Sequence, residues 1–318
     1  MATLPPFLRS PAQCAHPNSY INASFYHDRF KASVHALWWP SRVEHPRTVL
    51  VFIPGNPGLV DFYTPFLTAI HDASEGKIPI LAHAHIGHTP GFTILHDPPK
   101  FGLTAQVVSA IEAVDAVERA FGETTQVVVA GHSIGSWIAL QVLKARPDTV
   151  SSVLLLFPTI AHIANTPNGR VLSPLFRPPL PYIISCISIL LWLMPLRILW
   201  LLNKDWPLAQ VRVLRALTHS PSSIYSCLTM AHDEIQLVRE LDAPLMQEFR
   251  HRLHLFFAEQ DGWVGPDQRE LILRTFDADP GSVKVVHGRR DIPHAFCINH
   301  GAEVAAQCFE WLKSGDFL

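Results

Sequence analysis

The chain has 318 residues, of which 48% are hydrophobic and 16% are charged, so it can bury a large core in one or two domains. Its 25 basic and 27 acidic residues give a formal charge of −2, and we therefore expect no nucleic-acid partner. The five cysteines are scattered without a C-x-x-C pair, which argues against a disulfide framework and favours a reducing cytosolic setting. The N-terminus lacks the basic start and continuous apolar run of a signal peptide, so we expect no cleaved signal there.

Short apolar runs alternate with amphipathic segments along most of the chain. We predict strands over residues 20–26, 34–39, 48–53, 78–83, 127–130, 151–158, 253–258 and 283–287. We predict helices over residues 61–73, 103–121, 267–276 and 299–313, and a further helix directly after Ser133. This alternation is typical of the α/β class, with a mostly parallel central sheet flanked by helices on both faces.

The alternation stops between about residue 159 and residue 250. Residues 1–158 and 251–318 are therefore predicted to form the two parts of one α/β core, and residues 159–250 a helical insertion. Ligands of parallel sheets bind beyond the carboxyl ends of the strands. Because the insertion follows the strand at 151–158, we expect it to form a hydrophobic cap over such a site.

The segment VVVAGHSIGSWIALQVLK, residues 127–144, combines a β-branched run, a tight turn and a helical pattern. Its centre, Gly131-His132-Ser133-Ile134-Gly135, matches G-x-S-x-G, in which a serine is held on a turn between strand and helix. We expect the glycines to supply backbone angles that a Cβ would strain, and to let strand and helix approach closely. The pattern predicts Ser133 as a nucleophile, and a plain glycine-rich turn is the alternative.

A serine hydroxyl needs a base to take its proton and an acid to orient that base. In α/β-hydrolases the acid and then the histidine follow the serine along the chain. Asp261, in the loop after an apolar strand, is the predicted acid, and Glu259 is the second choice. His294 is the predicted base because it lies in a loop and opens the last helix, whereas His287 closes a strand and His300 lies inside that helix.

The loop after the strand at 48–53 has the sequence Pro54-Gly55-Asn56-Pro57-Gly58. Since proline has no amide hydrogen, the backbone donor of an oxyanion hole in this loop must come from Gly55 or Asn56. We predict the amides of Asn56 and Ile134 as the pair that stabilises an oxyanion, and a rigid pocket-shaping loop is the alternative.

The segment HAHIGH contains three histidines, His83, His85 and His88. Alternate residues of a strand share a face, so His83 and His85 could bind one metal ion. No acidic or cysteine ligand lies close by in the sequence, and we favour a polar strand end beside the pocket. We expect neither a metal nor an organic cofactor.

Residues 178–196 carry no charge and read PPLPYIISCISILLWLMPL. The run approaches spanning length, but its prolines interrupt it, while tryptophans 192, 200 and 206 suit a membrane interface. We favour paired helices that dip into one leaflet or a lipid surface; a cap lining a substrate tunnel and a true membrane span are the alternatives. The predicted membrane-associating residues are Tyr182, Ile184, Leu190, Trp192, Leu193 and Trp200.

Four motifs in this order resemble the lipid droplet-associated hydrolase family: FIPGNPGLVDFYTPFL, GHSIGSWIALQVLK, LLFPTIAHIANTPNGR and IPHAF. The similarity runs from about Val49 to the C-terminus. It implies an α/β-hydrolase fold, with Ser133 as nucleophile, Asp261 as acid and His294 as base. It also implies that the apolar insertion directs the protein to the lipid droplet and the endoplasmic reticulum.

Motifs and resemblance together predict a serine hydrolase that cleaves lipid carboxylic esters on the cytosolic face of the lipid droplet and endoplasmic reticulum. Sterol and glyceride esters are both plausible substrates. The main alternative is a lipid-droplet organising protein that keeps the fold but turns over little or no ester. This alternative stays open because a fold and three suitably spaced residues do not establish turnover. A thioesterase or lipase that acts on soluble acyl chains, with the cap as a tunnel, is a further alternative.

Overall fold

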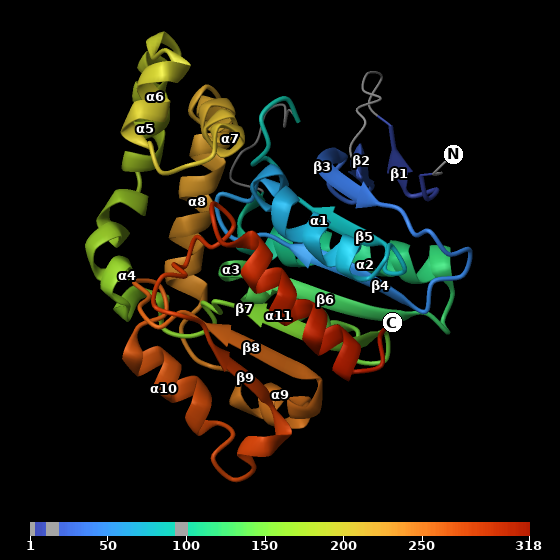
Figure 1. Ribbon diagram of the computed structural model, residues 1–318. Coiled ribbons are helices and arrows are strands. Elements are labelled where there is room, and N and C mark those ends of the chain that lie inside the picture. The colour runs from blue at the N-terminus through green and yellow to red at the C-terminus, as the bar shows by residue number, and fades with distance from the viewer. Residues whose placement is uncertain (1–3, 11–18, 93–100) are drawn as a thin grey trace.

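The computed structural model describes residues 4–10, 19–92 and 101–318, and its centre is a nine-stranded sheet (Figure 1). The spatial order of the strands is β1-β2-β3-β5-β4-β6-β7-β8-β9. The strands are β1 (Leu8–Arg9), β2 (Ile21–His27), β3 (Ala32–Trp39), β4 (Thr48–Ile53), β5 (Ile80–His83), β6 (Gln126–His132), β7 (Val150–Leu156), β8 (Leu253–Phe257) and β9 (Lys284–His287). The six strands β5, β4, β6, β7, β8 and β9 pair in parallel in this spatial order. Strands β1, β2 and β3 join the β5 edge in antiparallel pairing.

The predicted α/β architecture is confirmed, and helices cover both faces of the sheet. The helices of the core are α1 (Thr64–Ala73), α2 (Leu103–Phe121), α3 (Ile134–Ala145), α10 (Pro266–Arg274) and α11 (Gly301–Ser314). Helices α1 and α11 pack together in front of the sheet in Figure 1, and α2 and α3 pack together behind it.

Each face of the sheet has its own hydrophobic core because side chains alternate along every buried strand. In β4, Val49, Val51 and Ile53 join the core beneath α2 and α3, while Leu50 and Phe52 join the core beneath α1 and α11. Both sets are excluded from solvent, which explains the continuous apolar sequence of this strand.

The segment between β7 and β8 carries most of the remaining helices. These are α4 (Pro167–Leu172), α5 (Leu180–Ile187), α6 (Leu196–Leu202), α7 (Leu208–Thr218), α8 (Pro221–Leu237) and α9 (Ala243–Glu248). Figure 1 shows α4 to α8 gathered at one end of the sheet, with α5 and α6 farthest from it. Short 3-10 segments link these pieces, among them η4 (Ser173–Phe176) and η5 (Ser188–Leu193).

Helix α5 and the segments that follow it bury small polar side chains and expose large apolar ones, which is the opposite of an ordinary surface helix. Ser185 and Ser188 are buried, and their hydroxyls donate to the backbone carbonyls of Tyr182 and Ser185. The large apolar side chains point outward instead, with Leu193 82% exposed. We call this surface the apolar face; it consists of Tyr182, Ile183, Ile187, Ile189, Leu190, Trp192, Leu193, Ile198, Trp200, Leu201 and Leu202.

The broken helices of this region bear on the possible membrane contacts. No single helix among the described residues has the length and apolar composition to cross a membrane; Pro167–Phe176 and Leu180–Leu193 meet those criteria only as a pair bent by 81°. Five of the six predicted membrane-associating side chains are exposed, whereas Ile184 is half-buried. The sequence predicted Trp206 at a membrane interface together with Trp192 and Trp200. In the structure Trp206 lies outside the apolar face and packs edge-on against Phe62.

Candidate active site

Four loops at the carboxyl ends of parallel strands bring the predicted site residues together. Ser133 follows β6, Asn56 lies in the loop after β4, Asp261 follows β8, and His294 follows β9. Because parallel strands end at the same edge of a sheet, side chains far apart in sequence meet there. The cap segment leaves the core from this same edge, after β7.

The turn at Ser133 differs from the expected one in where the strained backbone lies. Ser133 itself has φ 55° and ψ −122°, a conformation that L-residues rarely adopt, while neither glycine of the motif has a left-handed φ. The glycines are needed for close approach alone. A Cβ on Gly131 would overlap the backbone of Gly135, and one on Gly135 would overlap the carbonyl oxygens of Ile53 and Pro54.

Ser133, His294 and Asp261 form a continuous chain of hydrogen bonds. The Ser133 Oγ lies 2.9 Å from His294 Nε2, and His294 Nδ1 lies 2.7 Å from Asp261 Oδ2. A carboxylate can only accept, so Nδ1 carries the proton and Nε2 is free to accept from the serine hydroxyl. In this arrangement the histidine is oriented to take the Ser133 proton.

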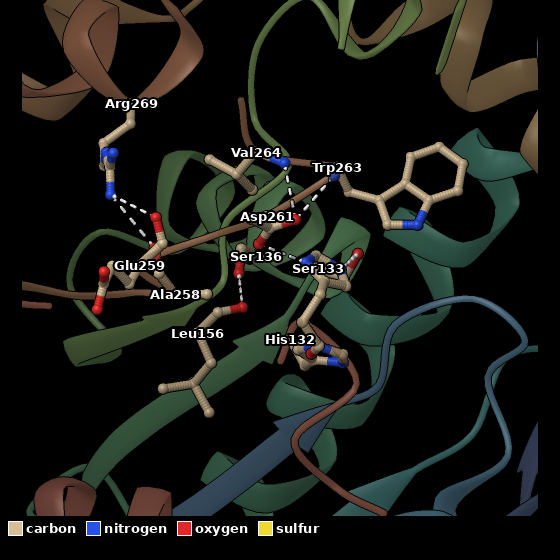
Figure 2. A network of polar contacts seen from close by, with 11 residues as sticks. His132, Ser133, Ser136, Leu156, Ala258, Glu259, Asp261, Trp263, Val264 and Arg269 are labelled. Carbon is tan, nitrogen blue, oxygen red and sulfur yellow. Dashed lines mark hydrogen bonds and ion pairs between the residues drawn. The ribbon is translucent and has the colours of Figure 1, made fainter. Parts of the chain in front are cut away.

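The two oxygens of Asp261 have separate tasks. Oδ1 accepts hydrogen bonds from the backbone amides of Trp263 and Val264, at 2.7 and 3.0 Å (Figure 2). Oδ2 faces His294. The Asp261 side chain is only 2% exposed. The carboxylate of Asp261 therefore holds its own turn and contacts His294 at the same time, so the turn alternative does not compete with that contact.

The competing acid and histidines point elsewhere. Glu259 is exposed. His287 stacks on Phe257, and His300 lies 3.4 Å from Glu303 at the start of α11. The sequence-based expectation that His294 opens the last helix is wrong, because α11 begins only at Gly301.

The loop after β4 has three backbone amides over residues 54–58, and the Gly58 amide already donates to the Gly55 carbonyl. The Gly55 amide donates to the Tyr63 hydroxyl at 3.1 Å, so Asn56 is the candidate donor in this loop. The Asn56 side chain is fixed from the cap, because its Nδ2 donates to the carbonyl of Cys227 and to Glu234 Oε1, both at 2.9 Å. Ile134, the predicted second donor, is the first residue of α3. The backbone amides of this first turn form the positive end of the helix dipole.

A buried pair that sequence reasoning missed, Tyr63 and His132, joins the loop after β4 to the loop after β9. The Tyr63 hydroxyl accepts from the Gly55 amide and donates to His132 Nδ1 at 2.7 Å. His132 Nε2 then donates to the backbone carbonyl of His294 at 2.9 Å. Burial, reinforced by the nearby His294, holds the pKa of His132 well below its usual range, so the ring stays neutral and keeps this pattern.

The histidines of HAHIGH support the loop after β4 from behind. His88 Nδ1 lies 2.8 Å from the Pro57 carbonyl, and a Cβ on Gly58 would collide with the His85 ring. His83 Nε2 faces His27 Nε2 at 2.9 Å instead of pointing at His85. No group of three potential ligands suited to a metal ion occurs in the described ranges.

A cavity of about 420 Å³ lies against Ser133 and His294. Most of its lining is apolar, and the cap supplies a large part of it: Phe176, Trp206, Leu214, Leu217, Cys227, Leu228, Ala231, Glu234 and Ile235. The insertion thus has two distinct surfaces. Helices α7 and α8 line the cavity, while α5 and α6 carry the apolar face on the outside.

Comparison with known proteins gives the family. The family described as lipid-droplet associated hydrolase matches residues 46–297, well over half of the chain. Lipid droplet-associated hydrolase of Rattus norvegicus is 26% identical over 291 residues, which cover 86% of each chain, and that of Homo sapiens is 27% identical over 299 residues, which cover 87% of this chain and 88% of the human one. A bacterial membrane phospholipase A of known structure shares the fold, with a TM-score of 0.65 and 15% identity over 94% of this chain and 87% of that chain. The chain belongs to the lipid-droplet associated hydrolase family.

Proposed function

We propose that the protein hydrolyses carboxylic esters of lipids, with Ser133 as nucleophile, His294 as general base and Asp261 as the group that orients it. The single observation that carries this proposal is the hydrogen-bonded chain from Asp261 through His294 to Ser133, next to an apolar cavity. An apolar cavity with a few convergent polar groups suits a lipid ester better than a charged metabolite.

In the proposed reaction the Ser133 Oγ attacks the ester carbonyl while His294 Nε2 takes its proton. The amides of Asn56 and Ile134 stabilise the negative oxygen of the tetrahedral intermediate. The intermediate collapses to an acyl-serine, and His294 gives its proton to the departing alcohol. Water then attacks the acyl-serine with His294 again as base, which releases the fatty acid and restores Ser133.

The apolar face supports action at a lipid surface. Large exposed hydrophobic patches on a protein are typical of interaction sites, and the exposed tryptophans Trp192 and Trp200 suit an interface. Arg177, Arg197 and Lys204 are exposed on the same segments and can contact anionic headgroups. Relatives of this chain are named for the lipid droplet. We place the proposed reaction on the cytosolic face of the lipid droplet and the endoplasmic reticulum.

The test compares the wild-type protein with Ser133→Ala on p-nitrophenyl butyrate and on a long-chain ester in phospholipid-coated droplets. We expect wild-type turnover of both esters and a loss of at least about 10⁴-fold in the variant, because the attacking oxygen is gone. Circular dichroism and the melting temperature verify that both proteins are folded. Equal rates for the two proteins contradict the assignment, and droplet binding without turnover by folded wild-type protein supports the organising role instead.

A further inference from the structure

The cavity beside Ser133 is lined by more polar side chains than the proposed reaction needs. His132 and Asn56 line it, but Tyr63 and the backbone of His294 engage the two ring nitrogens of His132, and helix α8 engages the side-chain amide of Asn56. The thiol of Cys227 lies 3.4 Å from the Pro57 carbonyl. Two groups outside the Ser133, His294 and Asp261 chain remain to be explained, the hydroxyl of Thr159 and the carboxyl of Glu234.

Thr159 lies directly beside the proposed nucleophile. It follows β7, and its backbone amide is 3.4 Å from the Ser133 carbonyl. Its side chain is 4% exposed and lines the cavity, yet Oγ1 has no hydrogen-bond partner among the described residues. A buried hydroxyl without a partner is costly, and a ligand that supplies one removes that cost.

Glu234 reaches the same cavity from helix α8. Its Oε1 accepts from Asn56 Nδ2, and Oε2 makes no hydrogen bond within the described part of the chain. Burial raises the pKa of this carboxyl to about 8, and the neighbouring Asp233 adds to the effect, so at neutral pH it is mostly protonated and can donate. A neutral carboxyl in an apolar wall suits an uncharged hydroxyl better than a cationic partner.

The two groups belong to segments that are fastened together. The amides of His162 and Ile163, shortly after Thr159, donate to the carbonyls of Arg239 and Val238 at the end of α8. Val238 in turn donates to the Glu234 carbonyl, one helical turn back. The chain that follows Thr159 is therefore hydrogen-bonded to the end of the helix that carries Glu234, and both residues line the same cavity.

We propose that Thr159 and Glu234 form a subsite for free hydroxyl groups on the alcohol part of the ester. The substrate class that fits is a long-chain monoester of glycerol or a similar small polyol, whose acyl chain fills the apolar cavity. Triacylglycerols and sterol esters carry no hydroxyl that could satisfy this pair. This inference rests on the proposed ester hydrolysis and adds the choice of alcohol to it.

The experiment compares 1-palmitoylglycerol with propyl palmitate, which has the same acyl chain and ester bond but no hydroxyl. We expect the wild-type protein to prefer the monoglyceride by about 10- to 100-fold in kcat/KM, because a buried polar group left unpaired penalises the alcohol that lacks it. Thr159→Val and Glu234→Met should each lower that preference by about tenfold or more, whereas Glu234→Gln, which resembles the protonated carboxyl, should keep it. Thr159→Ser, which keeps the hydroxyl, should restore it.

Thr149→Val makes the same chemical change at a threonine that bonds Glu118 far from the cavity, and it should leave the preference intact. Melting temperatures verify that each variant is folded. A wild type that hydrolyses both esters equally well, or a Thr159→Val that slows both by the same factor, overturns the subsite and leaves ester hydrolysis standing. Hydrolysis of neither ester by folded wild-type protein overturns the proposed function itself.

Discussion

Replacement of His294 by alanine is expected to lower kcat for ester hydrolysis by about 10⁴-fold or more. Without the imidazole nothing takes the proton from the Ser133 hydroxyl, which lies 2.9 Å from Nε2, and nothing protonates the departing alcohol. The measurement is single-substrate kinetics on p-nitrophenyl butyrate, so that lipid binding does not enter the result. His294→Ala with kcat within tenfold of wild type contradicts the assignment of the base.

Two further variants test whether the loss is specific to His294 and whether Asp261 orients it. His287→Ala changes an exposed histidine that stacks on Phe257, and its kcat should stay close to that of wild type. Asp261→Asn should give a loss of about 10³- to 10⁴-fold, because an asparagine can keep the turn through Oδ1 but offers His294 Nδ1 a donor where an acceptor is needed. Equal activity of Asp261→Asn and wild type would leave the orienting role without support.

Replacement of three leucines of the apolar face by serine is expected to weaken binding to phospholipid-coated droplets by about 100-fold or more. Leu190, Leu193 and Leu201 are 66%, 82% and 68% exposed, so their truncation costs the folded protein little. Each leucine buried in lipid contributes on the order of 1 to 2 kcal/mol, and three together exceed the difference needed for that loss. Droplet flotation measures the bound fraction directly.

The chain offers a matched control for the leucine triple. Val43, Leu237 and Leu271 are exposed hydrophobic side chains outside the apolar face, at 41%, 49% and 37%, and their replacement by serine should leave flotation unchanged. None of the three face leucines lines the cavity, so hydrolysis of a soluble ester should fall far less than hydrolysis in droplets. Equal flotation of both triples argues that lipid contacts lie elsewhere.

The core elements could be predicted because their signals are local. The buried strand Thr48–Ile53 and the helix Leu103–Phe121 have the predicted bounds, since the first is an apolar run that ends at proline and the second a long amphipathic pattern that follows glycine. The meeting of Ser133, Asp261 and His294 also follows from sequence, because each was placed in a loop at the same sheet edge.

The unpredicted features depend on contacts between distant segments. The bond between Tyr63 and His132 joins residues 69 positions apart, and Glu234 meets Asn56 across 178 positions. Neither pairing leaves a periodic signal in the chain. The backbone strain at Ser133 could not be assigned either, because the sequence shows which residues are small but not which one adopts the left-handed φ.

The orientation of side chains in the insertion could not be predicted from the sequence either. The apolar composition of residues 178–203 favoured contact with a lipid surface and left a tunnel-lining cap as an alternative. Hydropathy does not distinguish a side chain that faces lipid from one that faces a cavity. Trp206 lines the cavity, whereas Trp192 and Trp200, which lie close to it in the sequence, are exposed. Ile184 is half-buried, and its helix α5 packs against α8.

Covalent labelling with a fluorophosphonate probe tests the central claim most directly, because the probe reacts with an activated serine and needs no knowledge of the substrate. We expect labelling of wild-type protein on the peptide that contains Ser133, and no labelling of Ser133→Ala or His294→Ala. Failure of folded wild-type protein to react in the presence of droplets, or persistent labelling of Ser133→Ala, would contradict it.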